Sequence, residues 1–223
     1  MGCPACRPAA ERSPARVVHE GITARSQYAT PGLIAAVAYS GHDPADDPRW
    51  PESGAPTRVE YGRWCRHWCG MACLLMILEH RDGSAPSLHS LLTRSLRFGT
   101  YQEHPDGTIR GMFYEPFAQY AAAAHDLKAH VHRQLPVSGI RTQLATGHLV
   151  IASVHKEIRH PGLPSPGKGG HLVLVTGYDG DLLHFRNPSG HTHDTRNATL
   201  PCSTFTGFYA ERAISVSACH GQL

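Results

Sequence analysis

No stretch of this sequence is apolar for the roughly 20 residues that a membrane-spanning helix needs. Residues 1–16 also lack the apolar core of a secretory signal. An excess of one charge is missing as well, because 21 basic residues are opposed by 18 acidic ones, and a net charge of +3 argues against a nucleic-acid groove or a polybasic membrane patch. We therefore expect a cytoplasmic protein that acts on peptides or small molecules, without nucleic-acid or membrane partners, and the oligomeric state stays open.

A disulfide framework is absent too. The seven cysteines are an odd number, and three of them lie at positions 65, 69 and 73, which is typical of reduced thiols. Cys3 and Cys6 form half of a zinc knuckle with no second half, and Cys6 stands where a myristoylation signal has Ser or Thr. We therefore predict no metal site and no cofactor, and we interpret residues 1–14 as a disordered tail.

The sequence does contain a helical first half and a β-rich second half. Residues 71–78 are apolar on every side, which predicts a central helix buried all round. We expect an α+β fold in which an N-terminal helical half packs on a C-terminal antiparallel sheet, with residues 15–60 as an N-terminal extension and residues 61–223 as a single catalytic domain. Helices are predicted over residues 33–38, 71–78, 87–96, 115–129 and 138–146, and strands over 149–154, 171–178, 182–186 and 208–216.

Cys69 stands at the predicted start of the central helix. The positive end of the helix dipole and the free N–H groups there stabilise a thiolate, and the N–H of Cys69 can donate to a developing oxyanion. Gly70 would let a substrate backbone come close. Cys69 could instead be an inert core thiol, and Cys65 is an alternative nucleophile, whereas we assign Cys73 to the core.

His171 begins an apolar strand after a glycine pair, and Asn187 ends the next strand. Cysteine, histidine and asparagine in this chain order are the residues of the papain-like arrangement, in which the amide oxygen orients the imidazole. Side chains alternate along strands, so His171 and Asn187 share a face only if the turn between them is odd-numbered, with Gly180 at positive φ. A structural histidine is the alternative for His171. Other residues that could orient the imidazole are Asp179, Asp181 and Asp194.

Three motifs together resemble a known family. Trp68–Leu74, Gly170–Asp179 and Asn187-Pro188 are similar to the C39-like, papain-fold cysteine peptidases, which include the domains that trim leader peptides from bacteriocin precursors. The resemblance covers about residues 61–190 and implies a papain-like fold with Cys69 as nucleophile, His171 as base and Asn187 as orienting residue.

The chain departs from this family at two points. The family's oxyanion glutamine is replaced by Arg63, which leaves Arg63, Trp64, His67, Trp68, Gly70 and Gly170 as candidates for oxyanion or substrate contacts. The family's bacteriocin processors are fused to ABC transporters, and this chain has no membrane segment or nucleotide-binding motif. We therefore do not expect export-coupled leader cleavage.

The leading hypothesis is a cysteine hydrolase that cleaves an amide bond in a peptide or peptide-like metabolite through an acyl-enzyme. An acyltransferase or amide-forming enzyme is the first alternative, favoured if residues 156–170 form a closed apolar lid. A non-catalytic peptide-binding module is the second. A zinc hydrolase is a further possibility because of His191-Thr192-His193-Asp194.

Overall fold

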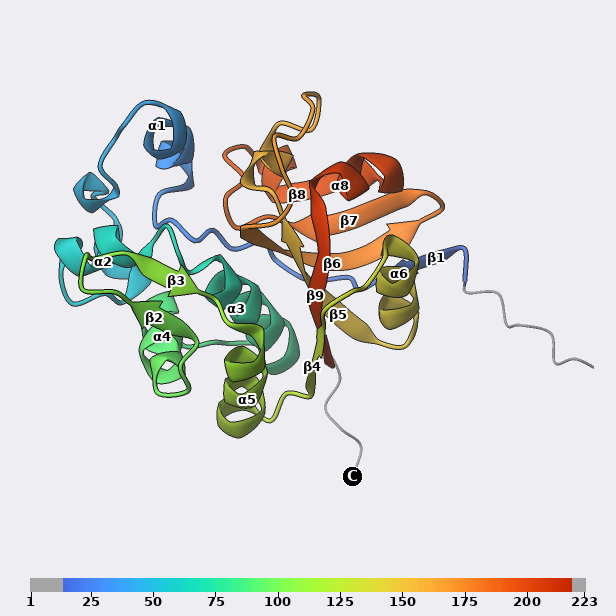
Figure 1. The fold of residues 1–223 in the computed structure, drawn as a ribbon, viewed down its shortest axis with the longest axis horizontal. Helices are drawn as coiled ribbons and strands as arrows, with labels where there is room; N and C mark the ends of the chain where they lie inside the picture. Colours follow the sequence, from blue (N-terminus) through green and yellow to red (C-terminus); the bar gives the residue numbers. More distant parts are fainter. Residues whose placement is uncertain (1–13, 218–223) are drawn as a thin grey trace, which may run out of the picture.

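The structure, a computed structural model, describes residues 14–217, and it has a helical half and a sheet half (Figure 1). The predicted mixture of helices and an antiparallel sheet is confirmed at this level. The helical half consists of α1 (Ile34–Tyr39), α2 (Arg58–Trp64), α3 (Cys69–Asp82), α4 (Leu88–Leu96), α5 (Tyr114–His125) and a hairpin of β2 (Tyr101–Glu103) and β3 (Ile109–Gly111). Short 3-10 helices lie at Pro31–Leu33, Pro44–Asp46, Trp50–Ser53 and Lys156–Arg159.

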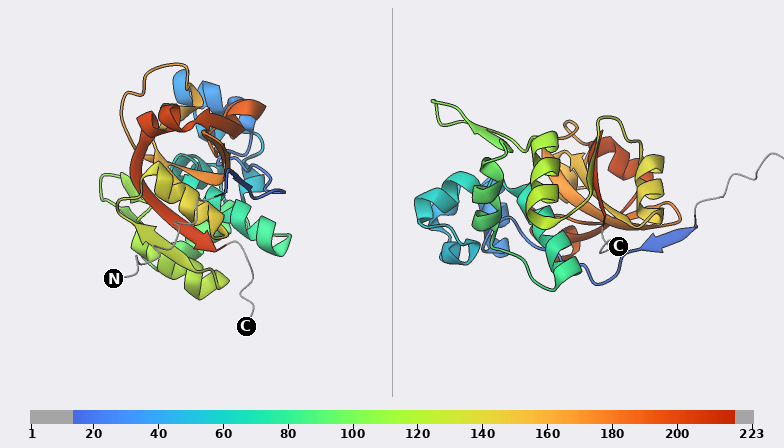
Figure 2. Two further views of the ribbon diagram at one scale, coloured as in Figure 1. Left: turned by 90° about the vertical axis from the view of Figure 1, so that its right-hand side faces the viewer. Right: turned by 90° about the horizontal axis from the view of Figure 1, so that it is seen from below.

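The sheet half is built on seven antiparallel strands. Their spatial order is β4 (Ala129–His132), β9 (Tyr209–Ser217), β5 (His148–Val154), β6 (His171–Asp179), β7 (Leu182–Arg186) and β8 (Asn197–Pro201), and β1 (Arg16–Val18) pairs with the end of β6. The connections include α6 (Val137–Ala145), α7 (His193–Arg196) and α8 (Cys202–Phe208). Figure 2 shows β9 as a long, curved strand.

Helix α3 is the centre of the helical half, as predicted. Nine of its 14 residues are buried, so the helix is covered on all sides. The helix ends at Asp82 and is capped by Gly83, whose φ of 76° lies in the left-handed region that glycine adopts without strain. Burial of α3 against β6 holds the start of the helix beside the sheet.

Strands β5 and β6 are buried on both faces because each face has its own core. Ile151 and Leu174 pack in the cluster around α3, whereas their neighbours Val150 and Val175 pack in the cluster around α6 and α8. Both strands are therefore continuous apolar runs rather than alternating patterns. The two cores meet across these strands, which is where the start of α3 and the sheet come together.

Several segments differ from the sequence-based expectations. The helix predicted over residues 115–129 ends at His125, because Asp126 adopts a left-handed φ of 51° and the chain then turns into β4. The sequence patterns also did not indicate α2, the β2–β3 hairpin, α7, β8 or α8.

The N-terminal predictions are only partly covered by the structure. Residues 1–13, with Cys3 and Cys6, lie outside the described residues, and the carbonyl of Pro14 accepts a hydrogen bond from the Tyr178 hydroxyl at 3.0 Å. Within the segment predicted as an extension, β1 joins the main sheet. The proposed boundary at residue 60 stays a prediction. In the part of the chain that the structure describes, no helix combines the length and apolar character required to span a membrane.

Candidate active site

Cys69 is the first residue of α3, so its sulfur lies where the free N–H groups of the helix begin. The side chain is buried, and the backbone N–H groups of Leu172 and Gly70 lie close enough to its sulfur to stabilise the charged thiolate. Leu172 directly follows His171 on β6. The contact therefore brings the sulfur against the end of the strand that holds the imidazole.

The neighbouring cysteines have different surroundings. Cys73, one turn further along α3, is fully buried in the core, in line with its assignment from the sequence. The Cys65 thiol is directed at the carbonyl of Gly62, 3.6 Å away. Of these three cysteines, only Cys69 lines a cavity together with His171.

The turn between β6 and β7 has two residues, Gly180 and Asp181, because Asp179 pairs with Leu182. The prediction of an odd-numbered turn is therefore wrong. Gly180 does have the predicted positive φ, at 54°. With regular pairing, a two-residue turn would have separated His171 from Asn187.

An extra residue inside β6 restores the alignment. The register of the β6–β7 pair shifts between Val175 and Gly177, so that Thr176 forms a β-bulge. The extra residue reverses the alternation of side chains, so the residues of β6 on the far side of the bulge from the turn point to the opposite face of the β6–β7 ribbon compared with regular pairing. His171 and Asn187 are therefore on the same face.

The N-terminal strand contacts this bulge directly. The N–H of His19 donates to the carbonyl of Thr176 at 2.9 Å, immediately after the three residues that pair with β6. A Cβ at Gly177 would lie 2.6 Å from the carbonyl oxygen of Val17, so only glycine allows β1 this close approach. The bulge that aligns the site thus depends on a segment about 160 residues away in the sequence.

His171 and Asn187 form a hydrogen bond whose direction can be assigned. The Nε2 atom of His171 lies 2.9 Å from Oδ1 of Asn187. The backbone N–H of Ser189 donates to the same oxygen at 3.0 Å, which identifies this atom as the amide oxygen rather than the nitrogen. Nε2 must therefore hold the proton, and the lone pair of the neutral ring is on Nδ1.

The other candidates for orienting the imidazole lie elsewhere. Asp179 pairs with Arg16 at 3.3 Å, and Asp181 and Asp194 are exposed. The second polar contact of His171 is instead Ser189, whose Oγ lies 3.0 Å from Nε2. No sequence pattern had indicated Ser189.

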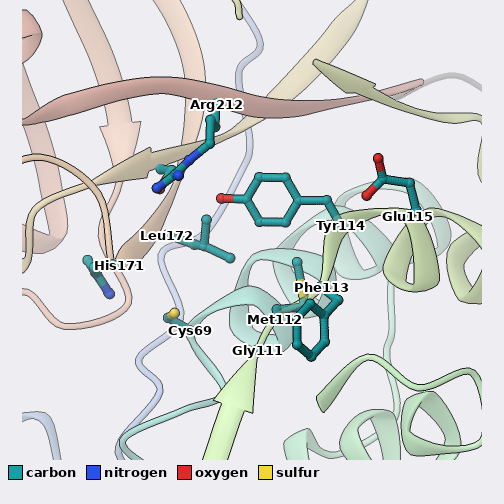
Figure 3. A pocket seen from close by; sticks show the side chains of 11 residues that line it. Cys69, Gly111, Met112, Phe113, Tyr114, Glu115, His171, Leu172 and Arg212 are labelled. Carbon is teal, nitrogen blue, oxygen red and sulfur yellow. The ribbon is translucent and has the colours of Figure 1, made fainter. Parts of the chain in front are cut away.

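The cavity around Cys69 encloses about 330 Å³ between the two halves (Figure 3). Cys69, His171, Leu172 and Gly170 line one part of it, and the segment before α5 lines the other. Gly170 has a φ of 92°, and a Cβ there would meet no atom within 4 Å, so this predicted residue borders open space.

Most of the predicted oxyanion or substrate residues lie outside this cavity. Three of their side chains have polar partners elsewhere: the Arg63 guanidinium donates to Glu103, the Trp64 indole donates to Glu60, and the Trp68 indole donates to the carbonyl of Gln27. His67 is held through its backbone carbonyl, which accepts a hydrogen bond from the Tyr101 hydroxyl. The replacement of the family's glutamine by Arg63 therefore does not bring a guanidinium to Cys69.

Gly70 has a packing role rather than the expected contact with substrate. A Cβ at this position would lie 2.5 Å from Sδ of Met112 and 3.0 Å from Cδ1 of Leu172. The space beside Gly70 is thus occupied by side chains of the protein itself. Gly70 allows α3 to approach β6 closely.

Burial makes the neutral forms of both reactive groups the stable ones. It raises the pKa of the Cys69 thiol to about 11, although the N–H groups of Leu172 and Gly70 act in the opposite direction. Burial also lowers the pKa of His171 to about 4, against the effect of the hydrogen bond with Asn187. The helix start therefore does not produce the stable thiolate expected from the sequence.

Gln27 joins the two segments that surround the site. Its side-chain amide donates to the carbonyl of Cys65 at 2.7 Å, and its backbone N–H donates to the carbonyl of Pro188 at 2.9 Å. Gln27 is 2% exposed, so both bonds are shielded from water. It lies in a segment without a recognisable motif, and no pattern in the sequence could have indicated it.

The geometry gives little support to the closed lid or to the metal site. Of residues 156–170, only Gly170 lines the cavity, and Leu163 is exposed, so this loop is not a closed apolar lid. Within residues 14–217, no group of three or more histidine, cysteine or acidic side chains is arranged to hold a metal ion, and His191–Asp194 is no exception.

Comparison with known proteins agrees with the family resemblance. A sequence model of the Peptidase C39 like family matches residues 55–215. A candidate C39-like peptidase from Bacillus anthracis is similar in structure, with a TM-score of 0.49 and 16% identity over 67% of this chain and 88% of the other. The search of curated proteins found no match. Because the family match spans more than half of the sequence, the chain belongs to the Peptidase C39 like family.

Proposed function

We propose that Cys69, His171 and Asn187 act together to hydrolyse an amide bond in a peptide or peptide-like metabolite. Membership of a peptidase family supports a cysteine peptidase in general terms. The observation that carries the specific proposal is the hydrogen bond from Nε2 of His171 to Oδ1 of Asn187, because it leaves Nδ1 as the proton acceptor in the cavity of Cys69.

In the proposed reaction, the Cys69 thiol attacks the substrate carbonyl while Nδ1 of His171 takes the thiol proton. As the tetrahedral intermediate collapses, the protonated His171 gives this proton to the leaving amine, and an acyl-enzyme remains on the sulfur. Water then attacks the thioester with the same nitrogen as base. Asn187 keeps the imidazole in the required tautomer and orientation.

The pKa directions favour proton transfer during the attack rather than a preformed ion pair. With the thiol pKa raised to about 11 and the imidazole pKa lowered to about 4, both groups are neutral near pH 7. The backbone N–H of Cys69 at the start of α3 is the proposed oxyanion donor. Arg63 has no part in this scheme.

One experiment tests the proposal without knowledge of the substrate. A proteome-derived peptide library is incubated with the wild type, with Cys69→Ala and with Cys73→Ala, and new peptide termini are counted by mass spectrometry. We expect cleavage by the wild type and Cys73→Ala only, and an acyl adduct on Cys69 after an acid quench. Cleavage by Cys69→Ala would contradict the proposed nucleophile.

A non-catalytic binding module stays the second candidate. It is favoured by the high pKa of Cys69 and by the position of Arg63, whose guanidinium binds Glu103 instead of replacing the family's oxyanion donor. If the wild type retains peptides from the library but produces neither cleavage nor adduct, this candidate replaces the hydrolase. The family match does not support the acyltransferase alternative.

A further inference from the structure

The cavity of Cys69 contains a second group of polar side chains. Arg212 of β9, Tyr114 at the start of α5 and Ser153 of β5 line it together with Cys69 and His171. In Figure 3, the Tyr114 hydroxyl points toward the Arg212 side chain above Leu172. Three elements from both halves thus bring these groups to one part of the cavity.

Arg212 is a cation without a counter-charge. No described residue forms an ion pair or a hydrogen bond with its guanidinium. The carboxylate of Glu115, which also lines the cavity, is bound by Arg133 at 2.7 Å and lies beyond Tyr114 from Arg212 (Figure 3). An unpaired guanidinium beside a proposed reactive cysteine is therefore available to a ligand.

The position of Arg212 relative to His171 is restricted by the backbone. A Cβ at Gly169 would lie 2.9 Å from a terminal nitrogen of the guanidinium, so glycine provides the space that Arg212 occupies. Gly169 and Gly170 directly precede His171, and both have positive φ, 78° and 92°. The same glycine pair therefore leads into the strand of the imidazole and accommodates the cation.

Tyr114 adds a hydroxyl group to this cation. The polar side chain of Ser153, which is 2% exposed, and the charge of Arg212 both lower the pKa of Tyr114 against the larger effect of burial. A planar guanidinium with a hydroxyl beside it matches the two oxygens of a carboxylate. The chemistry of the group is thus that of a carboxylate-binding site.

We propose that the substrate has a glutamate or aspartate side chain within two residues of the scissile amide, bound by Arg212 and Tyr114. The inference rests on the proposed function, because it names the class of substrate for the same cavity. The volume of about 330 Å³ is at the lower end of the range for ligand sites, which suits one such residue rather than a long segment.

Binding is tested in the Cys69→Ala protein, so that it does not depend on turnover. The probes are two blocked tetrapeptides, acetyl-Ala-Glu-Ala-Ala-amide and its Gln counterpart, measured by titration calorimetry. We expect the Glu peptide to bind about 10-fold or more tightly than the Gln peptide, and an added Arg212→Gln change to remove the difference. Equal affinities, or no binding of the Glu peptide, would overturn the inference.

Two further variants separate a specific site from a general effect of charge. Arg97→Gln removes an exposed arginine at the end of α4, outside the cavity, and should retain the preference. Arg212→Glu should reverse it, so that a Lys peptide binds better than the Glu peptide. Loss of preference in Arg97→Gln, or its persistence in Arg212→Glu, would contradict a role for Arg212.

The peptide library distinguishes this inference from the proposed function. With the wild type, acidic residues should be enriched at one position within two residues of the cleaved bonds, and Arg212→Gln should lose this enrichment. Cleavage without acidic enrichment rejects the inference but leaves the hydrolase intact. A preference for the Glu peptide without any cleavage retains the carboxylate site and rejects the hydrolase.

Discussion

Helix α3 and the β6–β7 ribbon bring their residues to the same cavity in different ways. Cys69 is placed by a helix whose start is encoded by adjacent residues and whose burial follows from its own apolar composition. His171 and Asn187 are placed by strand register, which changes with one extra residue at Thr176. A helix position is thus set locally, whereas the face of a strand depends on every residue between it and the turn.

The two regions also differ in what supports them. Helix α3 lies within the core of the helical half. The ribbon depends on β1, which pairs with the end of β6, and on the adjoining His19, which donates a hydrogen bond to the bulge. Variants in the helix should therefore test the chemistry itself, and variants in the ribbon should test how register controls it.

The largest effect is expected at the helix. Cys69→Ala should reduce turnover on the order of 10⁴-fold or more, because it removes the nucleophile. Cys73→Ala is the matched control one turn away and should retain most of the activity. Turnover of a cleaved library peptide is measured for both, with thermal unfolding as a check of folding. Equal losses in the two variants would mean that α3 has only a structural role.

Acid pH should lower the stability of the folded protein because His171 becomes protonated. Its pKa is lowered to about 4 in the folded protein from 6.5, so the folded state resists protonation. The stabilising contribution is complete above pH 6.5 and is lost as the pH falls toward 4, by up to about 3 kcal/mol. Urea unfolding between about pH 4 and 7 should show a smaller loss in His171→Gln than in the wild type.

The exposed His193 provides the control for this titration. His193→Gln should lose stability in acid as the wild type does. If His171→Gln and the wild type have the same pH dependence, the imidazole is protonated equally easily in the folded and unfolded states. The buried, neutral His171 of the proposed mechanism would then be wrong.

Asn187→Ala should lower turnover about 10²-fold, because the imidazole loses the group that orients it. Asn197→Ala, in the neighbouring strand β8, changes the same residue type away from the cavity and should have little effect. The measurement is kcat/KM for one library peptide. A loss no greater than that of Asn197→Ala would show that register at Asn187 is unimportant for catalysis.

Gly177→Ala should cost about 2 kcal/mol of stability, since its Cβ would collide with the backbone of β1. The control is Gly207→Ala in α8, where a Cβ would meet no atom within 4 Å. Chemical denaturation measures both. If Gly177→Ala unfolds like the wild type, the contact between β1 and the bulge does not support the ribbon.

The elements that the sequence predicted correctly are those with strong local signals. The buried helix that begins near Cys69, the strand that begins at His171 and the capping residue Ser87 of α4 all follow from short patterns. It also indicated that His171 and Asn187 belong together, but for the wrong reason, since an odd turn was expected and a bulge was found. The local signal is Gly177, which follows Thr176, because a glycine inside a strand indicates either a bulge or a close backbone contact and does not distinguish the two.

The sequence by itself determined that a buried helix begins at a cysteine and that an apolar strand begins at a histidine, because composition and periodicity act over a few residues. Only the tertiary structure decided that Asn187 and Ser189 set the tautomer of His171, that Arg63 is engaged elsewhere, and that Arg212 is left unpaired in the cavity. These features depend on contacts between distant segments, and their energies exist only once the chain has folded.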